Sequence, residues 1–158
     1  MGDDAEFAVL FHAHVARVVR LAALLGADDA EDVAQEAFCR LYAARERVDD
    51  RVVAYLNRIV VNEVRSRHRR RATAKRAPLH LVEHPVSIEH VQDYAERNAV
   101  IDAVNTLPAR KREALVLRYW LDLPLAEIAE AMSVRVGTVK SLLSRGIDAL
   151  ANELGEGR

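Results

Sequence analysis

The sequence has few of the residues that all-β, disulfide-bonded or membrane-spanning proteins depend on. Its 158 residues include one Cys, four Pro and six Gly. Because Cys39 is alone, no disulfide can form within the chain, and a reducing compartment fits. Gly and Pro are too scarce for an all-β chain that must turn often. No run of about 18 apolar residues is present, so we expect no transmembrane helix and no membrane contact.

The remaining composition is that of a chain that forms a hydrophobic core. Hydrophobic residues make up 51% of the sequence and charged residues 30%, which excludes a disordered chain. The N-terminus begins with Asp3, Asp4 and Glu6, the opposite of the basic start of a signal peptide. We therefore expect a cytoplasmic protein made of one ordinary domain or two small helical ones.

Charge is distributed unevenly along the chain. The total of 23 basic and 24 acidic residues gives a net charge of −1. Counted by segment, the net charge is −5 over residues 1–64, +7 over 65–76, −4 over 77–109 and +1 over 110–158. A dense basic block in an otherwise acidic chain is the usual sign of contact with a polyanion. The neutral total therefore does not exclude nucleic acid as a partner.

Apolar residues at three- and four-residue steps predict three helices in the first half of the chain. Gly26 is expected to end the first helix, Asp28 and Asp29 to cap the second, and Asp49 and Asp50 to precede the third. The expected buried residues are Phe7, Leu10, Phe11, Val15, Val18, Leu21 and Leu25, then Ala30, Val33, Ala37, Phe38, Leu41 and Tyr42, then Val53, Leu56, Val60 and Val64.

The second half repeats the helical pattern after a segment that contains Pro78 and Pro85. Helices are expected around Val100–Leu107, over Ala109–Leu121, from Pro124 to Met132 and from Val136 to about Leu154. The sequence thus predicts an all-α protein with two small helical domains, a three-helix bundle over residues 1–76 and a helix-turn-helix domain over 93–158. A linker over 77–92 joins them.

The last two predicted helices have the pattern of a helix-turn-helix. Leu125, Ile128 and Ala129 are expected to face a core, and a second buried stripe is expected at Val139, Leu143, Ile147 and Leu150. The polar residues that this leaves outside suit the major groove of duplex DNA. They are Arg135, Thr138, Lys140, Ser141, Ser144 and Arg145. The alternative is a solvated face on an ordinary helical hairpin.

The third predicted helix carries a polar stripe distinct from its apolar one. Tyr55, Arg58, Asn62, Arg65 and Arg69 recur at three- and four-residue steps. An aromatic ring, an amide and three guanidinium groups on one line suit a melted DNA strand, through stacking, base-edge hydrogen bonds and phosphate contacts. The other basic side chains of this segment are interpreted as phosphate ligands, or alternatively as a solvated tail. They are Arg67, Arg70, Arg71, Lys75 and Arg76.

Three groups of motifs resemble the extracytoplasmic-function (ECF) sigma factors, the smallest members of the sigma-70 family. Residues 107–120 (LPARKREALVLRYW), 127–130 (EIAE) and 136–141 (VGTVKS) resemble domain 4 of that family. Residues 30–42 (AEDVAQEAFCRLY) resemble region 2.2, and 54–71 (AYLNRIVVNEVRSRHRRR) resemble regions 2.3 and 2.4. The resemblance covers almost the whole chain, in the order and with the spacing of the family.

The resemblance implies a non-enzymatic transcription initiation factor without a cofactor. Region 2.2 would dock on the clamp helices of the β′ subunit of RNA polymerase through Asp32, Gln35 and Glu36, with Phe38 in the core. The stripe from Tyr55 to Arg69 would read the −10 element of promoter DNA. The loop at residues 47–51 would help to hold an unpaired base. Tyr55 has the alternative of packing inward, as the family's Trp at that position does.

The same resemblance assigns roles to the second domain and suggests further partners. The helix-turn-helix would read the −35 element, and this domain would also contact the flap of the β subunit. An anti-sigma factor is a typical partner of the family, although no residue here identifies one. Bound to polymerase, the protein would associate with the nucleoid.

Three positions depart from the family pattern. Ser133 stands where the turn of the helix-turn-helix usually has Gly, and a positive φ there would cost Ser about 1 kcal/mol. Arg135 replaces a common small or capping residue, and Leu142 stands where many members have Arg. The change at Leu142 removes an expected −35 contact and bears on promoter affinity more than on fold.

Two other functional classes fit parts of the sequence. One is a dimeric helix-turn-helix regulator that binds duplex DNA without polymerase, which leaves the first domain without a role. The other is a zinc protein that uses His68, His80, His84 and His90. Those His residues mostly lie in the Pro-containing linker with no Cys nearby and no general base, so we expect no metal site.

Overall fold

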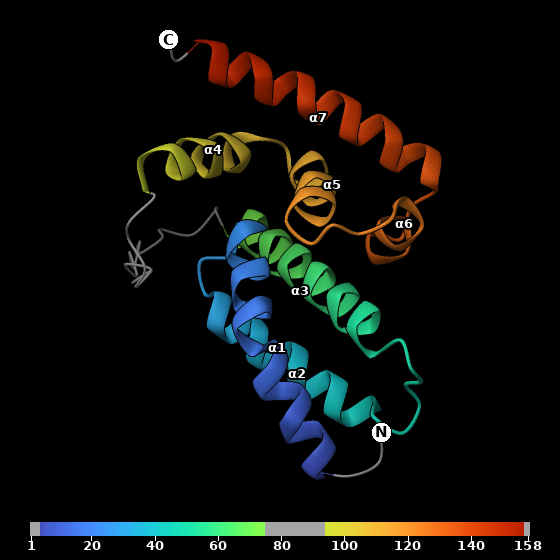
Figure 1. Ribbon diagram of the computed structural model, residues 1–158. Coiled ribbons are helices and arrows are strands. Elements are labelled where there is room, and N and C mark those ends of the chain that lie inside the picture. The colour runs from blue at the N-terminus through green and yellow to red at the C-terminus, as the bar shows by residue number, and fades with distance from the viewer. Residues whose placement is uncertain (1–3, 75–93, 157–158) are drawn as a thin grey trace. The chain divides into compact units, whose positions relative to one another are not determined.

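The computed structural model describes residues 4–74 and 94–156, which form seven α-helices with no strand among them (Figure 1). In chain order they are α1 (Asp4–Leu24), α2 (Ala30–Ala44), α3 (Val52–Ala74), α4 (Tyr94–Thr106), α5 (Ala109–Tyr119), α6 (Leu125–Met132) and α7 (Val136–Glu156). The all-α class predicted from sequence is confirmed. The chain divides into two compact units, one built on α1–α3 and the other containing α4, α5 and α7.

The first unit is a three-helix bundle in which every helix contacts the other two. Its core follows the predicted stripes, and the apolar side chains that are at most 4% exposed include Val18, Leu21, Val33, Phe38, Leu41, Leu56, Val60 and Val64. The predictions for Tyr42 and Val53 were wrong, because these side chains are 36% and 39% exposed. Val53 lies in the first turn of α3, at the end of the helix rather than in its packed centre.

Gly26 ends α1 as the sequence predicts. Its φ is 90°, a conformation in which a Cβ would be strained. The Gly26 amide donates to the Ala23 carbonyl at 3.0 Å and the Ala27 amide donates to the Ala22 carbonyl at 3.0 Å, the two bonds of a Schellman motif. Asp29 occupies the N-cap of α2, but its side chain makes no capping hydrogen bond. The predicted cap position is confirmed, but the Asp29 carboxylate pairs with Arg67 instead of capping the helix.

α1 is long and apolar enough to cross a membrane, judged by length and composition, with a mean hydropathy of 1.5 over its most apolar window. This segment contains no uninterrupted apolar run, so the sequence did not predict a membrane-spanning helix here. The helix of a packed bundle has the same composition. α1 contacts both α2 and α3, which accounts for its buried apolar residues.

In the second unit α7 contacts both α4 and α5. The apolar side chains that are at most 9% exposed include Val104, Leu107, Leu115, Leu117, Val139 and Leu143. The prediction for Ile147 was wrong, because it is 43% exposed. Gly146 is buried instead, and a Cβ added there would lie 3.1 Å from the Leu115 Cδ1 atom. The buried face of α7 therefore continues from Leu143 to Gly146 rather than to Ile147. At Gly146 the backbone of α7 approaches α5 closely.

Several sequence expectations lie outside the described residues. These are the linker at 77–92, the phosphate-ligand assignments of Lys75 and Arg76, and the linker residues His80, His84 and His90. The domain boundaries at residues 76 and 93 also lie there and stay predictions.

Candidate nucleic-acid and polymerase interfaces

The polar stripe of α3 lies on a side of the helix that the core does not cover. Tyr55 is 37% exposed, Arg58 and Arg69 are exposed, and Asn62 and Arg65 are half-buried. The alternating residues Leu56, Val60 and Val64 are buried and fix the rotation of the helix. The five stripe residues are therefore presented together, with Tyr55 only partly packed inward.

Three of the basic residues expected to contact phosphate have acidic partners within the bundle. Arg67 pairs with Asp29 of the α1–α2 loop and, at 3.0 Å, with Glu63. Arg71 pairs with Asp28. Arg70 Nη2 lies 3.4 Å from Glu63 Oε1, with 70% of the Arg70 side chain exposed. Burial alone would lower the pKa of Arg67, but its hydrogen bonds and attraction to Glu63 and Asp29 outweigh it and raise the pKa.

Glu63 is a buried carboxylate that sequence reasoning missed. Its side chain is 2% exposed, and Arg40 of α2 lies 2.9 Å from Oε2 while Arg67 lies 3.0 Å from Oε1. A buried carboxylate is costly unless it is paired, and these guanidinium groups supply the pairing. The available signal was an acidic residue adjacent to the apolar stripe of α3, four residues before an Arg.

The three α2 residues expected to contact polymerase differ in their environments. Asp32 and Gln35 are exposed, whereas Glu36 Oε1 accepts a hydrogen bond from Arg40 Nε at 2.9 Å. Phe38 is 3% exposed, so its assignment to the core is confirmed. Asp32 and Gln35 are thus fully presented to a partner, and Glu36 is presented as part of an ion pair.

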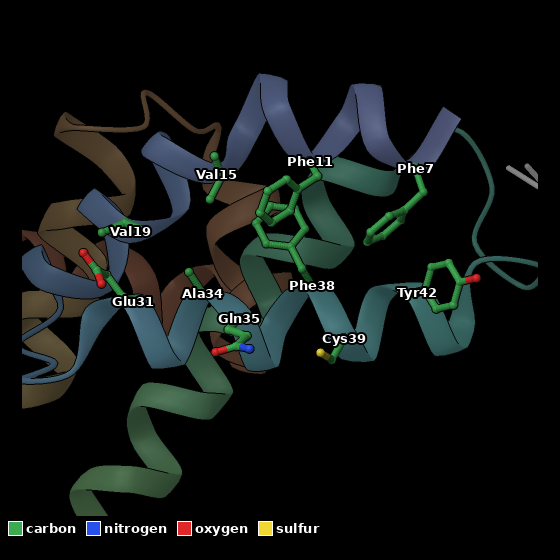
Figure 2. A pocket seen from close by; sticks show the side chains of 10 residues that line it. All are labelled: Phe7, Phe11, Val15, Val19, Glu31, Ala34, Gln35, Phe38, Cys39 and Tyr42. Atoms are coloured by element: carbon green, nitrogen blue, oxygen red, sulfur yellow. The ribbon is translucent and has the colours of Figure 1, made fainter. Parts of the chain in front are cut away.

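An apolar groove of about 690 Å³ runs between α1 and α2. Figure 2 shows the α1 side chains above it and those of α2 below it. It is lined by Phe7, Phe11, Val15 and Val19 from α1 and by Glu31, Ala34, Gln35, Phe38, Cys39 and Tyr42 from α2. Sequence reasoning placed Phe7, Phe11 and Val15 in the core; they are half-buried and form the floor and wall of this groove.

Aromatic contacts shape the groove. The rings of Phe11 and Phe38 meet edge to face with centroids 4.9 Å apart, and those of Phe7 and Tyr42 meet similarly at 5.0 Å. Such edge-to-face pairs are the favoured arrangement for aromatic rings. The groove is therefore preformed by ring packing, with Gln35 as a polar group among apolar ones.

Tyr42 joins the end of the groove to the start of α1. Its hydroxyl donates to Asp4 Oδ1 at 2.7 Å, and the Arg45 guanidinium lies 3.9 Å from the centre of its ring. The hydrogen bond to Asp4 raises the pKa of Tyr42, with attraction to Arg45 acting in the opposite direction. These contacts tie the first turn of α1 to the last turn of α2.

The six residues expected to face duplex DNA from the helix-turn-helix are all exposed. They are Arg135, Thr138, Lys140, Ser141, Ser144 and Arg145, while Val139 and Leu143 between them are buried. The turn before α7 contains Ser133 at a φ of 58°, which is the strained conformation foreseen for this position. Leu142 is half-buried, so it presents less apolar surface than the sequence suggested.

An exposed aromatic pair lies at the C-terminal end of α5. Tyr119 is 59% exposed and Trp120 is 38% exposed. The turn after them is held by Arg118 Nη1, which donates to the Leu123 carbonyl at 2.9 Å. Large exposed aromatic side chains on a small domain are typical of protein contact surfaces.

Among residues 4–74 and 94–156, no group of three or more His, Cys, Asp or Glu side chains is placed to hold a metal ion. His68 instead lies with Nε2 3.2 Å from the Gly26 carbonyl oxygen. Since a carbonyl only accepts, that nitrogen carries the proton in this contact. His68 therefore holds the α1–α2 loop.

Comparison with known families assigns both units. The model of sigma-70 region 2 matches residues 10–74, and that of sigma-70 region 4 matches residues 97–150. The RNA polymerase sigma-E factor of Streptomyces coelicolor is 31% identical over 158 residues, covering 98% of this chain and 89% of the relative. The ECF RNA polymerase sigma factor SigM of Mycobacterium tuberculosis is 35% identical over 165 residues, covering 98% of this chain and 80% of the relative.

Solved structures show the same fold. The sigma factor RpoE of Bartonella quintana, solved in complex with the anti-sigma factor NepR, has a TM-score of 0.78 at 23% identity, over 97% of this chain and 99% of that one. CnrH in complex with the cytosolic domain of CnrY has a TM-score of 0.74 at 24% identity, over 99% and 92%. With both regions matched in order across nearly the whole chain, the protein belongs to the ECF sigma factors of the sigma-70 family, which direct transcription initiation.

Proposed function

We propose that this protein binds core RNA polymerase through its first unit and directs it to promoters by reading a −10 and a −35 element. The observation that carries the proposal is the stripe from Tyr55 to Arg69, which is uncovered on α3 of a unit that matches sigma-70 region 2. The protein itself catalyses no reaction and requires no cofactor. It acts in the cytoplasm, where RNA polymerase and the chromosome are found.

The polymerase-binding surface is proposed to be the α1–α2 groove together with the exposed face of α2. The expected partner is the coiled-coil clamp helices of the β′ subunit, and a helix with an apolar face could bind in a groove floored by Phe11 and Phe38. Gln35 lines the groove and Asp32 is exposed on the same helix, and both would pair with basic and polar groups of the clamp helices. Glu36 would contribute from its ion pair with Arg40.

The −10 strand is proposed to lie along the α3 stripe. Asn62 would hydrogen-bond a base edge, and Tyr55 would stack on a base at the end nearer the loop at residues 47–51. Arg58, Arg65 and Arg69 would contact phosphates, which makes binding dependent on salt. The exposure of Arg58 and Arg69 supports these roles, because a phosphate reaches both without displacing the core.

The N-terminal half of α7 is proposed to enter the major groove of the −35 element. Arg135 directly precedes the helix and Thr138 lies in its first turn. Lys140 and Ser141 follow, and Ser144 and Arg145 complete the outer face. The exposed pair Tyr119 and Trp120 is the surface of this unit that best suits the β flap. Regulation by an anti-sigma factor is also proposed, supported by the solved RpoE–NepR complex of the same fold.

The test is transcription of fragmented genomic DNA by core RNA polymerase from the same organism, with and without this protein, with sequencing of transcript 5′ ends. New start sites that share two upstream motifs are the expected result. Identical start sites in both reactions, combined with no binding to the β′ subunit, would reject the proposal. If the chain instead forms a dimer that binds duplex DNA and ignores polymerase, the dimeric regulator is correct.

A further inference from the structure

The basic second half of α3 is attached to the rest of the bundle by an acidic cluster, defined as Asp28, Asp29 and Glu63. Asp28 pairs with Arg71 and Asp29 pairs with Arg67. Glu63 lies 3.0 Å from Arg67. His68 adds a 3.2 Å contact to the Gly26 carbonyl of the same loop. The α1–α2 loop therefore contacts α3 at three positions within about one helical turn.

Burial distinguishes the Glu63–Arg67 pair from ordinary surface ion pairs, whereas Arg71 and Asp28 are 51% and 60% exposed. Glu63 is 2% exposed and Arg67 is 25% exposed. Exposed ion pairs contribute little to stability, whereas a buried carboxylate that loses its partner is strongly destabilised. Arg67 is therefore held by a requirement of the core, and moving it to a phosphate would leave Glu63 with one fewer partner.

The cluster and the DNA stripe occupy different sides of α3. Glu63, Arg67 and Arg71 recur at four-residue steps and form one line along the helix. Arg58, Arg65 and Arg69 belong to the other line, with Asn62. Side chains on the first line contact the α1–α2 loop, so Arg67 or Arg71 reaches a strand lying along the second line only if it leaves its partner in that loop.

We propose that Asp28, Asp29 and Glu63 are positioning residues that retain Arg67 and Arg71 within the bundle, so that the DNA strand is contacted by the line of Arg58, Arg65 and Arg69 rather than by Arg67 and Arg71. This inference rests on the proposed capture of the −10 strand by α3. Arg70 stays available, since it is 70% exposed and its contact with Glu63 is 3.4 Å long. The cluster thereby withholds two of the seven basic residues of the block at 65–76 from the strand.

The first experiment measures the salt dependence of binding of the full chain to a short fluorescein-labelled single-stranded DNA of mixed sequence. Each phosphate contact on a single strand adds about 0.7 to the slope of log affinity against log salt. Arg69→Gln is expected to lower the slope by about 0.7 without changing Tm. Arg67→Gln is expected to leave the slope unchanged and to lower Tm. Equal losses of slope in both variants, with both Tm values unchanged, would overturn the proposal.

The second experiment releases Arg71. The double variant Asp28→Asn/Asp29→Asn removes the partner of Arg71, whereas Arg67 keeps its contact with Glu63. Its slope is therefore expected to rise by about 0.7, with tighter binding at low salt and a lower Tm. A purely structural role would lower Tm without raising the slope. The matched control Glu6→Gln/Glu46→Gln removes two exposed negative charges from the same unit and is expected to leave the slope unchanged. A slope that rises equally in the control overturns the proposal.

Thermal unfolding separates this proposal from the proposed function. Asp29→Asn, Arg67→Gln and the combined variant are expected to lower Tm non-additively, because either change removes the same contact. Additive losses of Tm would show that Asp29 and Arg67 do not stabilise the bundle through a shared contact, and would overturn the proposal even if the chain binds DNA. Failure of the unsubstituted chain to bind any single strand, with the non-additivity intact, would instead reject strand capture and with it the division of roles among the arginines.

Discussion

Ser133 adopts at the end of α6 the conformation that Gly26 adopts at the end of α1. Its φ is 58°, its amide donates to the Glu130 carbonyl at 3.2 Å, and the Val134 amide donates to the Ala129 carbonyl at 3.0 Å. This is again the Schellman pattern. One site has Gly, which has no Cβ, and the other has Ser, whose Cβ makes the left-handed conformation unfavourable. The turn of the helix-turn-helix is thus strained by a single side chain.

Ser133→Gly is expected to increase the free energy of unfolding by about 0.5–1 kcal/mol, because relief of the strain exceeds the greater freedom of Gly in the unfolded chain. Urea denaturation followed by circular dichroism measures the change. Ser144→Gly in the middle of α7 is the matched control and is expected to lower stability by about 0.5 kcal/mol. A loss of stability in both variants would show that Ser133 is not strained.

Among the helices, α7 combines a closely packed side with an exposed one that is proposed to contact DNA. Val139 and Leu143 are buried, and Gly146 continues this face against Leu115 of α5. The short distance leaves no room for a larger side chain, so the absence of a side chain at Gly146 sets how closely α7 approaches α5. The spacing of these two helices in turn determines how the outer face of α7 is presented.

Gly146→Val is expected to lower the free energy of unfolding by about 1–3 kcal/mol, the usual cost of overpacking a core. The Cβ alone would lie 3.1 Å from Leu115 Cδ1, whereas a Cβ at Gly137 would meet nothing within 4 Å. Gly137→Val in the same helix is therefore the matched control and should change stability little. Equal effects of the two substitutions in thermal unfolding would contradict close packing at Gly146.

At the scale of the whole molecule, the net charge of −1 is the sum of regions proposed to meet different partners. Asp32 and Glu31 are exposed on α2, while the exposed basic residues of α3 lie on another helix. An acidic surface for a protein partner and a basic stripe for DNA are both proposed for this bundle. Other acidic and basic side chains of the bundle pair with each other and so add little to either surface. Glu63 and Arg67 are such a pair.

Polymerase binding and strand capture are therefore expected to be separable by mutation. Asp32→Lys should weaken binding to core polymerase about tenfold, or ~1.4 kcal/mol, and leave single-strand binding intact. Asn62→Ala should impair promoter opening and leave polymerase binding unchanged.

A bulky maleimide on Cys39, the single Cys of the chain, should weaken binding to core polymerase as Asp32→Lys does, because Cys39 lines the groove. Loss of β′ binding in Asn62→Ala would contradict this division of the first unit.

The sequence by itself determined the helices and most of their buried faces, because apolar periodicity reflects a fixed geometry of 3.6 residues per turn. It also predicted the uncovered stripe from Tyr55 to Arg69 and the difficulty at Ser133, since both follow from local backbone geometry. It was wrong at Val53 and Ile147, where burial depends on the position and approach of a neighbouring helix.

Only the tertiary structure decided which charges are available. Asp29 was expected to cap α2, but α3 places Arg67 within reach of its carboxylate. Arg67 and Arg71 were expected to contact phosphate, but the loop before α2 supplies their partners. The groove between α1 and α2 likewise requires two helices to meet. Helical periodicity predicts which side of a single helix is buried. The ion pair between Asp29 and Arg67, which are 38 positions apart, depends instead on how the helices of the bundle pack against each other.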